Sequence, residues 1–196
     1  MSAPQEVKTE KASGQPFLTD VQELRRRARA NIDKGPVTPT YEGDVQVAIE
    51  LLQNVVATEI VCVLRYQMNA IAAAGISSQA VKEEFQEHAM AEYEHVKMAA
   101  ERINQLGGKP NLSPKGLVSR SATEYVDAET LVDMIKENLV AERLVIEHYR
   151  ELIRYFADKD PTTRVMLEHI LGEEEEHADD MHDLLVAHEG TPMLKN

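Results

Sequence analysis

The sequence predicts an all-α protein, a four-helix bundle with a short additional helix near its N-terminus. Three observations indicate this fold. Apolar residues recur at the 3.6-residue helical period through four long segments. Capping residues, glycine and proline separate these segments. Aromatic residues make up only 5% of the chain and Trp is absent, which argues against a β-sandwich.

Length and charge limit the possible functions. The 196 residues suffice for one domain with a sizeable core. The formal net charge of -13 should repel nucleic acid and anionic membranes and attract cations. We expect no membrane-spanning helix, because we find neither a run of about 18 apolar residues nor the apolar core of a signal peptide. The single cysteine, Cys62, excludes an intrachain disulfide and predicts a reducing, cytoplasmic location.

The N-terminal part of the chain differs in composition from the rest. Residues 1–16 are polar and predict a disordered tail. Residues 17–43 form an expected extension and linker, with a short helix over 18–33 that has Thr19 or Asp20 as its N-cap. Two prolines and two glycines then interrupt the chain before the first long helix.

The first two long helices are bounded by clear start and stop signals. We expect the first over 44–74, before a glycine. The second should begin with Ser77 or Ser78 as N-cap and end at the glycine pair 107–108.

The remaining two long helices follow a longer connection. We expect the third over 127–156. The fourth should start at Pro161, a residue suited to the first helical position, with Asp160 as N-cap, and should run to about residue 188.

The connection lengths predict the topology. The links within the first pair and within the second pair of helices are short, which predicts antiparallel neighbours. The link over 107–126 is long enough to cross the bundle from end to end, so one long crossover joins helices two and three. The bundle domain should therefore span 44–190, with a C-terminal tail at 191–196.

Six ionisable residues interrupt the apolar faces of the four helices. Each lies near the middle of its helix, so all six should reach one level in an antiparallel bundle. The pattern also repeats, because each half of the chain offers one Glu and then a Glu-x-x-His motif 32 or 33 residues later, which implies a pseudo-twofold axis. The six residues are Glu59, Glu92, His95, Glu142, Glu174 and His177.

Unpaired charges in an apolar core would each cost several kcal/mol. Two divalent metal ions would resolve this, because four carboxylates balance their four positive charges and two neutral imidazoles add none. Residues three apart on a helix share a face, so each Glu-x-x-His can chelate. This donor set is typical of di-iron and di-manganese carboxylate bundles, and its oxygen-rich ligation suits Fe or Mn better than a thiolate-type zinc site. The six residues are thus candidate metal ligands and candidate catalytic residues.

Simpler interpretations compete with this one. A single Glu-x-x-His motif is more often a solvated helix surface, and only the two matched motifs favour a metal centre. Tyr66, two turns after Glu59, either hydrogen-bonds a ligand carboxylate or only packs. His88 is either an outer partner of the centre or a buried, hydrogen-bonded histidine. The basic run at 25–29 either contacts DNA or docks on an acidic surface.

Over residues 44–188 the sequence resembles the bacterioferritin branch of the ferritin-like superfamily. The residues that carry the resemblance are Glu59 with Tyr66 seven later, "EYEH" at 92–95, Glu142, and "EEEH" at 174–177. The resemblance implies a ferritin-like bundle and ferroxidase activity: two Fe²⁺ bind, O₂ or H₂O₂ takes their electrons, and Fe³⁺ passes to a mineral store.

The sequence departs from the bacterioferritin pattern in three ways, and these change the haem content and the subunit number that we expect. Tyr93 occupies the position of the family's haem-ligating Met, which argues against haem. The short segment after the fourth helix leaves no room for the fifth helix of 24-subunit shells. The chain also has an N-terminal extension of about 40 residues. The combination of these three departures looks more like the dodecameric Dps-like proteins with a bacterioferritin-type di-iron centre, although their cysteine pair is absent here. A homo-oligomer, preferably a dodecamer, is therefore expected.

Two other functions stay open at this point. A dimanganese catalase, or another small di-metal oxidase or peroxidase, would use the same ligands with a different metal or reaction. A DNA-protecting or structural cage would use the metal only to hold the bundle together. Net charge argues against DNA, while the N-terminal basic segment offers a route to it.

Overall fold

The computed structural model describes residues 20–75 and 78–189. The predicted tails at 1–16 and 191–196, and the alternative caps Thr19 and Ser77, lie outside these residues. The chain separates into two compact units, Met1–Pro39 and Thr40–Asn196, which are described separately.

The first unit contains helix α1 (Val21–Ala28) and a 3₁₀ turn, η1 (Ile32–Lys34). Asp20 is the N-cap of α1, and its carboxylate accepts hydrogen bonds from the next backbone N–H groups. The predicted helix over 18–33 is too long, because Asn31 adopts the left-handed region (φ 52°) and ends the regular helix before it. Within α1, Glu23 pairs with Arg26 and Arg27, which offsets part of the basic charge.

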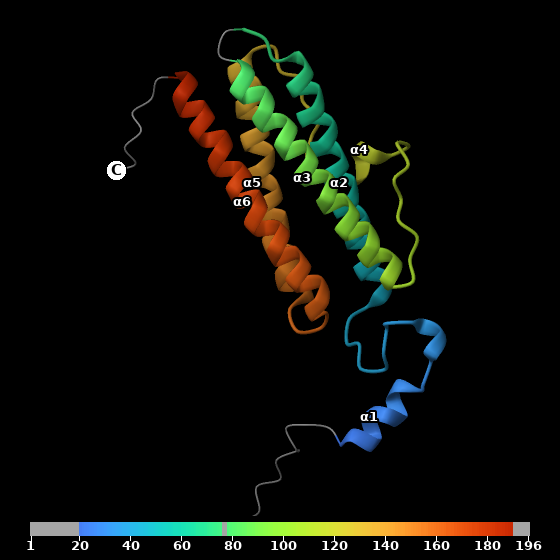
Figure 1. The fold of residues 1–196 in the computed structure, drawn as a ribbon. Coiled ribbons are helices and arrows are strands. Elements are labelled where there is room, and N and C mark those ends of the chain that lie inside the picture. The colour runs from blue at the N-terminus through green and yellow to red at the C-terminus, as the bar shows by residue number, and fades with distance from the viewer. Residues whose placement is uncertain (1–19, 76–77, 190–196) are drawn as a thin grey trace, which may run out of the picture. The chain divides into compact units, whose positions relative to one another are not determined.

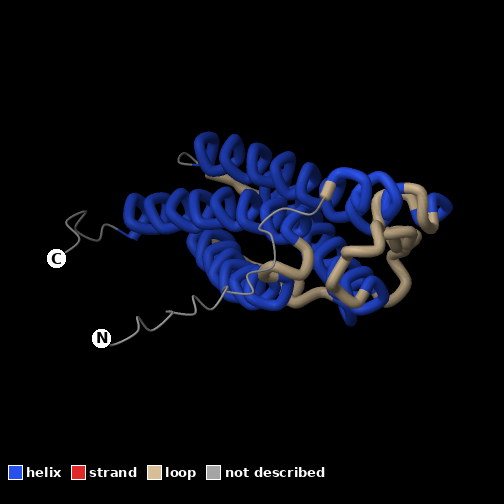
Figure 2. The backbone as a smooth tube through the Cα atoms, turned by 90° about the horizontal axis from the view of Figure 1, so that it is seen from below, coloured by secondary structure: helices blue, strands red, loops and turns tan. Residues whose placement is uncertain are grey.

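The second unit is a bundle of four long helices (Figure 1). Helices α2 and α3 pack as one antiparallel pair and α5 and α6 as another, and α2 also contacts α5 while α3 contacts α6. Every regular element in the described ranges is a helix (Figure 2). The predicted all-α four-helix bundle is confirmed. The long helices are α2 (Val45–Ala72), α3 (Ser78–Gln105), α5 (Leu131–Phe156) and α6 (Pro161–Glu189).

Local signals in the sequence fix the helix ends. Asp44 caps α2. After α3, Gly107 takes a left-handed conformation (φ 85°) and Gly108 N–H donates to the Ile103 carbonyl at 2.9 Å, which satisfies a free helix carbonyl. Asp160 caps α6 by accepting the Thr163 N–H at 3.0 Å.

The start of α5 corrects the prediction of a helix from residue 127. The helix begins at Leu131, because the hydroxyl of Thr130 accepts the Asp133 N–H at 3.1 Å and the Thr130 backbone is extended. The residues before Thr130 carry no comparable cap and continue the crossover.

Replacing Thr130 by alanine should destabilise the start of α5. The loss of an N-cap oxygen costs about 1 kcal/mol, which corresponds to a fall in Tm of about 2–4 °C for a chain of this size. Thermal unfolding followed by circular dichroism measures this. Thr130→Ser retains the hydroxyl and serves as the control, and equal Tm values for the Ala and Ser variants would contradict the assigned role.

The crossover between α3 and α5 is held against α2. It contains the short helix α4 (Leu117–Arg120), and Leu117 packs on Ala57 and Val61 of α2. The buried Arg65 of α2 donates to the Asn138 side chain of α5 at 2.8 Å and to a crossover carbonyl. The predicted long crossover therefore closes over one side of the bundle.

Helix α2 corrects the expectation that no segment is apolar enough to cross a membrane. In the described part of the chain, Val45–Ala72 alone meets that criterion of length and composition, with a mean hydropathy of 1.8 over its most apolar window, and half of that window is buried in the bundle. The apolar character of α2 follows from its position, because it contacts α3, α4 and α5.

Candidate metal centre

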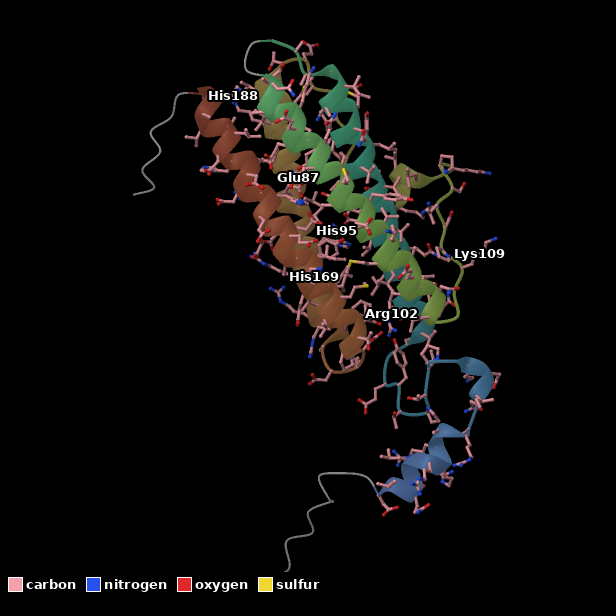
Figure 3. The ribbon with its side chains drawn as sticks, in the orientation of Figure 1. Glu87, His95, Arg102, Lys109, His169 and His188 are labelled. Carbon is pink, nitrogen blue, oxygen red and sulfur yellow. The ribbon has the colours of Figure 1, made fainter. Side chains whose placement is uncertain are left out.

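The structure brings all six predicted ligands together in the middle of the bundle. Helices α2 and α5 each supply one Glu, and α3 and α6 each supply a Glu and a His one turn apart. Glu59, Glu92, His95, Glu142 and Glu174 are fully buried, and His177 is 7% exposed. Figure 3 shows His95 midway along α3. Six ionisable side chains therefore share one apolar environment.

The six residues form two overlapping sets of four donors. Within each set, one donor atom from each residue lies within 4.8 Å of all the others. Glu59 and His95 belong to one set, and Glu142 and His177 to the other. Glu92 and Glu174 belong to both sets. This arrangement fits two cations with two shared carboxylates.

Both histidines face the carboxylates through Nδ1. His95 Nδ1 lies 3.1 Å from Glu174 and 3.3 Å from Glu92, and His177 Nδ1 lies 3.5 Å from the same two residues. On its other side, His95 Nε2 lies 2.6 Å from the carboxylate of Glu173. That contact orients the ring, as partners of metal-binding histidines commonly do.

Several buried polar atoms of the cluster lack a hydrogen bond of acceptable geometry. Such atoms are rare in native proteins, and each calls for a partner. Five of the six are carboxylate oxygens, so cations are partners that fit their chemistry. The atoms are Glu59 Oε2, Glu92 Oε1, Glu142 Oε2, both Glu174 oxygens and His177 Nδ1.

Burial and interactions with one another shift the pKa values of the cluster residues. Burial and the nearby charges of Glu92 and Glu174 raise the pKa values of Glu59 and Glu142 well above normal. Burial also opposes ionisation of His177, but hydrogen bonds to Glu174 and Glu92 outweigh it and raise its pKa to about 11. Without metal, the cluster therefore retains protons that bound cations would displace.

Two buried tyrosines connect the helices that carry the single glutamates. The hydroxyl of Tyr66 on α2 donates to Glu142 on α5, and the hydroxyl of Tyr149 on α5 donates to Glu59 on α2. The structure thus decides the open question about Tyr66 in favour of the hydrogen bond. Tyr149 was missed in the sequence, although it follows Glu142 by seven residues just as Tyr66 follows Glu59.

Glu173, the partner of His95, was also missed in the sequence. No spacing rule distinguishes it from the neighbouring glutamates of "EEEE". His88, in contrast, is buried and hydrogen-bonded, with Nδ1 3.2 Å from the Tyr66 hydroxyl. Tyr93 is 53% exposed, away from the buried cluster.

Tyr149→Phe should weaken metal binding about 10- to 100-fold, the range for partners that orient a ligand, because Glu59 loses its donor. The pseudo-twofold arrangement predicts a similar loss for Tyr66→Phe. Titration of the metal-free protein with Co²⁺, followed by visible absorption, measures the affinity. The exposed Tyr93 supplies the control Tyr93→Phe, and a Tyr149→Phe affinity equal to that control would exclude this role.

A four-helix bundle with a long crossover and a buried Glu–His cluster defines a ferritin-like protein. The chain belongs to this family, since residues 49–189 match the family described as "Ferritin-like domain".

The chain is also similar to individual members of this family in sequence and in structure. Over 137 residues, 68% of this chain and 74% of the relative, the sequence is 29% identical to the DNA protection during starvation protein of Pyrococcus furiosus. The structure is similar to the dodecameric thioferritin of Bacteroides fragilis, a bacterioferritin-related protein, with a TM-score of 0.72, 32% identity and coverage of 79% of this chain and 94% of that one. It is also similar to a ferritin-like, diiron-carboxylate protein of Bacillus anthracis, with a TM-score of 0.64, 27% identity and coverage of 72% and 96%.

Proposed function

We propose that this protein is a ferroxidase that oxidises Fe²⁺ with O₂ or H₂O₂ at a centre inside each chain and stores the ferric product in a cage. The observation that carries the proposal is the pair of overlapping donor sets, with Glu92 and Glu174 common to both. Family membership and the diiron-carboxylate relative support it.

Each residue of the centre has its own role in the proposed reaction. Glu59 and His95 would hold one iron, Glu142 and His177 the other, and Glu92 and Glu174 would contact both. Bound Fe²⁺ ions supply the electrons for reduction of the oxidant. Tyr66 and Tyr149 fix the orientation of the terminal carboxylates, and Glu173 fixes that of His95. The apolar residues around the cluster exclude bulk water.

Stoichiometric oxidation of Fe²⁺ tests this function. Two Fe²⁺ per chain, added in air to the metal-free protein, should give rapid ferric absorbance, and excess iron should continue to be oxidised and remain soluble. Absorbance no faster than in protein-free buffer would refute the proposal. Metal analysis of the purified protein, with O₂ evolution from H₂O₂, tests the dimanganese catalase alternative.

A dodecameric cage in the cytoplasm completes the proposal. The Bacteroides fragilis relative is dodecameric. Native mass spectrometry should give about twelve times the 22.0 kDa chain mass. A dimer would favour a small oxidase or peroxidase over a storage protein.

DNA protection is a second candidate function, because a relative is named for it. The net charge of -13 opposes DNA binding, and the basic run at 25–29 is partly paired with Glu23 in α1. A gel shift on supercoiled DNA at moderate salt, with and without residues 1–30, decides between the two. Retardation that requires those residues would support the DNA role.

A further inference from the structure

A second cluster of metal-binding side chains lies beside the buried centre. Glu84 and His88 are on α3, one turn apart, and Asp180 is on α6. One donor atom from each lies within 4.8 Å of the other two. His88 is buried, whereas the Glu84 and Asp180 side chains are 32% and 52% exposed, so the cluster extends from the bundle interior to the solvent.

The contact between His88 and Tyr66 is compatible with a tautomer of His88 whose Nε2 is free to bind a cation. Tyr66 has one hydroxyl hydrogen, which it donates to the carboxylate of Glu142. Its oxygen therefore acts as the acceptor for His88 Nδ1–H, at 3.2 Å. In this tautomer of the neutral ring, Nε2 carries a lone pair.

That lone pair faces two more acceptors. Nε2 lies 3.1 Å from Glu84 Oε1 and 3.4 Å from Asp180 Oδ2. One donor atom from each of the three residues lies within 4.8 Å of the other two, so one cation can contact all three. The chemistry of one imidazole and two carboxylates suits a divalent transition metal, and the Tyr66 contact at Nδ1 is the kind of partner that orients a metal-binding histidine.

The surroundings of this cluster add negative charge. Burial raises the pKa values of the Glu84 and Asp180 carboxyl groups. The charges of Asp180 and Glu87 add to this at Glu84, and those of Asp179, Glu176 and Asp183 add to it at Asp180, while His177 acts in the opposite direction at both. Figure 3 shows Glu87 on α3. An acidic surface of this kind concentrates divalent cations at its centre.

The cluster also adjoins the buried centre directly. The His88 ring stacks on the ring of His177, with centroids 4.1 Å apart and an interplanar angle of 24°. Through Tyr66, His88 also connects to Glu142. The stacked rings of His88 and His177 thus place the surface cluster next to the second donor set.

We propose that Glu84, His88 and Asp180 bind a third divalent cation, and that this surface position delivers Fe²⁺ to the buried centre. The delivery role rests on the proposed ferroxidase function, but cation binding does not. The side chains supply three ligands, and water would complete the coordination on the exposed side.

Co²⁺ binding to the full chain tests the site without iron chemistry. The variant Glu84→Gln/Asp180→Asn should bind one Co²⁺ fewer per chain than wild type. The matched control Glu83→Gln/Glu168→Gln removes the same charge from the same two helices, at residues outside the cluster and its acidic surroundings, and should retain it. In crystals soaked with Co²⁺, anomalous scattering should place an ion at His88 Nε2. Equal stoichiometry in the two double variants, or no anomalous peak at His88, would overturn the site.

Iron kinetics test the delivery role separately. With less than two Fe²⁺ per chain, Glu84→Gln/Asp180→Asn should oxidise iron about 10-fold more slowly than the control variant, because local enrichment of the cation is lost, while the final ferric yield stays equal. Equal rates combined with the loss of one Co²⁺ would refute delivery and leave the site. If wild type fails to oxidise Fe²⁺, the proposed function and the delivery role both fail, and the Co²⁺ result still decides the site.

Discussion

Glu92→Gln should abolish rapid Fe²⁺ oxidation, with a loss of more than about 100-fold in initial rate, beyond the range seen for groups that only orient a ligand. Glu92 belongs to both donor sets and is fully buried. The amide retains the shape of the side chain but removes its charge and turns an N–H₂ group towards the cations. Both metal positions should therefore lose affinity at once.

Two further variants make this prediction specific. Glu59→Gln removes a residue of one donor set only and should weaken one of the two metals. Glu94→Gln changes an exposed glutamate two residues away, which pairs with Lys97, and should behave like wild type. Stopped-flow absorbance after Fe²⁺ addition gives the rates and a Co²⁺ titration gives the stoichiometry. A Glu92→Gln rate similar to that of Glu94→Gln would exclude the assigned centre.

Removal of metal should lower Tm by about 10 °C near pH 8. A cation that binds only the folded chain at a concentration of about 1,000 times its Kd stabilises it by about 4 kcal/mol, and for a chain of this size about 2–4 °C corresponds to each kcal/mol. Differential scanning calorimetry of the Co²⁺-loaded protein, before and after treatment with a chelator, measures the change.

The effect of metal removal should grow as the pH rises. In the metal-free fold, the pKa values of Glu59 and Glu142 lie above their unfolded values, and that of His177 is raised to about 11. The folded state thus binds more protons than the unfolded state, and its stability falls as pH rises from about 6.5 towards 11. Bound cations displace these protons, so the loaded protein should lack this slope.

Calorimetry of the metal-free and the metal-loaded protein at pH 6.5 and pH 9 tests this difference in pH dependence. The metal-free protein should have a lower Tm at pH 9, while the loaded protein should change little. A metal-free Tm that rises with pH, or parallel changes in both forms, would contradict the proton retention assigned to the cluster.

Features that depend on residues close together in the chain were predicted more accurately from the sequence than features that depend on distant residues. Asp20 and Asp160, both candidate caps in the sequence, cap their helices, because a cap is made by a side chain and backbone only a few residues apart. The start of α5 was predicted too early, since apolar periodicity extends into the crossover and only the Thr130 cap marks the boundary.

Apolar periodicity and spacing also located the candidate centre. Glu92 and His95 interrupt a buried face, and a Glu-x-x-His motif recurs at matching depth in α6, so convergence followed from helix geometry. The same spacing could have predicted the role of Tyr149, because it follows Glu142 by seven residues as Tyr66 follows Glu59. The role of Glu173 could not be predicted from spacing, because its contact with His95 depends on how α3 and α6 pack.

The sequence by itself determined the all-α fold, the order of the helices and the set of six candidate ligands, because these depend on periodicity and spacing along single helices. Only the tertiary structure decided that Glu92 and Glu174 belong to both donor sets, that each tyrosine binds the glutamate of the other helix, and that His88 joins Glu84 and Asp180 beside His177. These features depend on the rotation and packing of helices against one another, which arise from contacts between residues far apart in the chain.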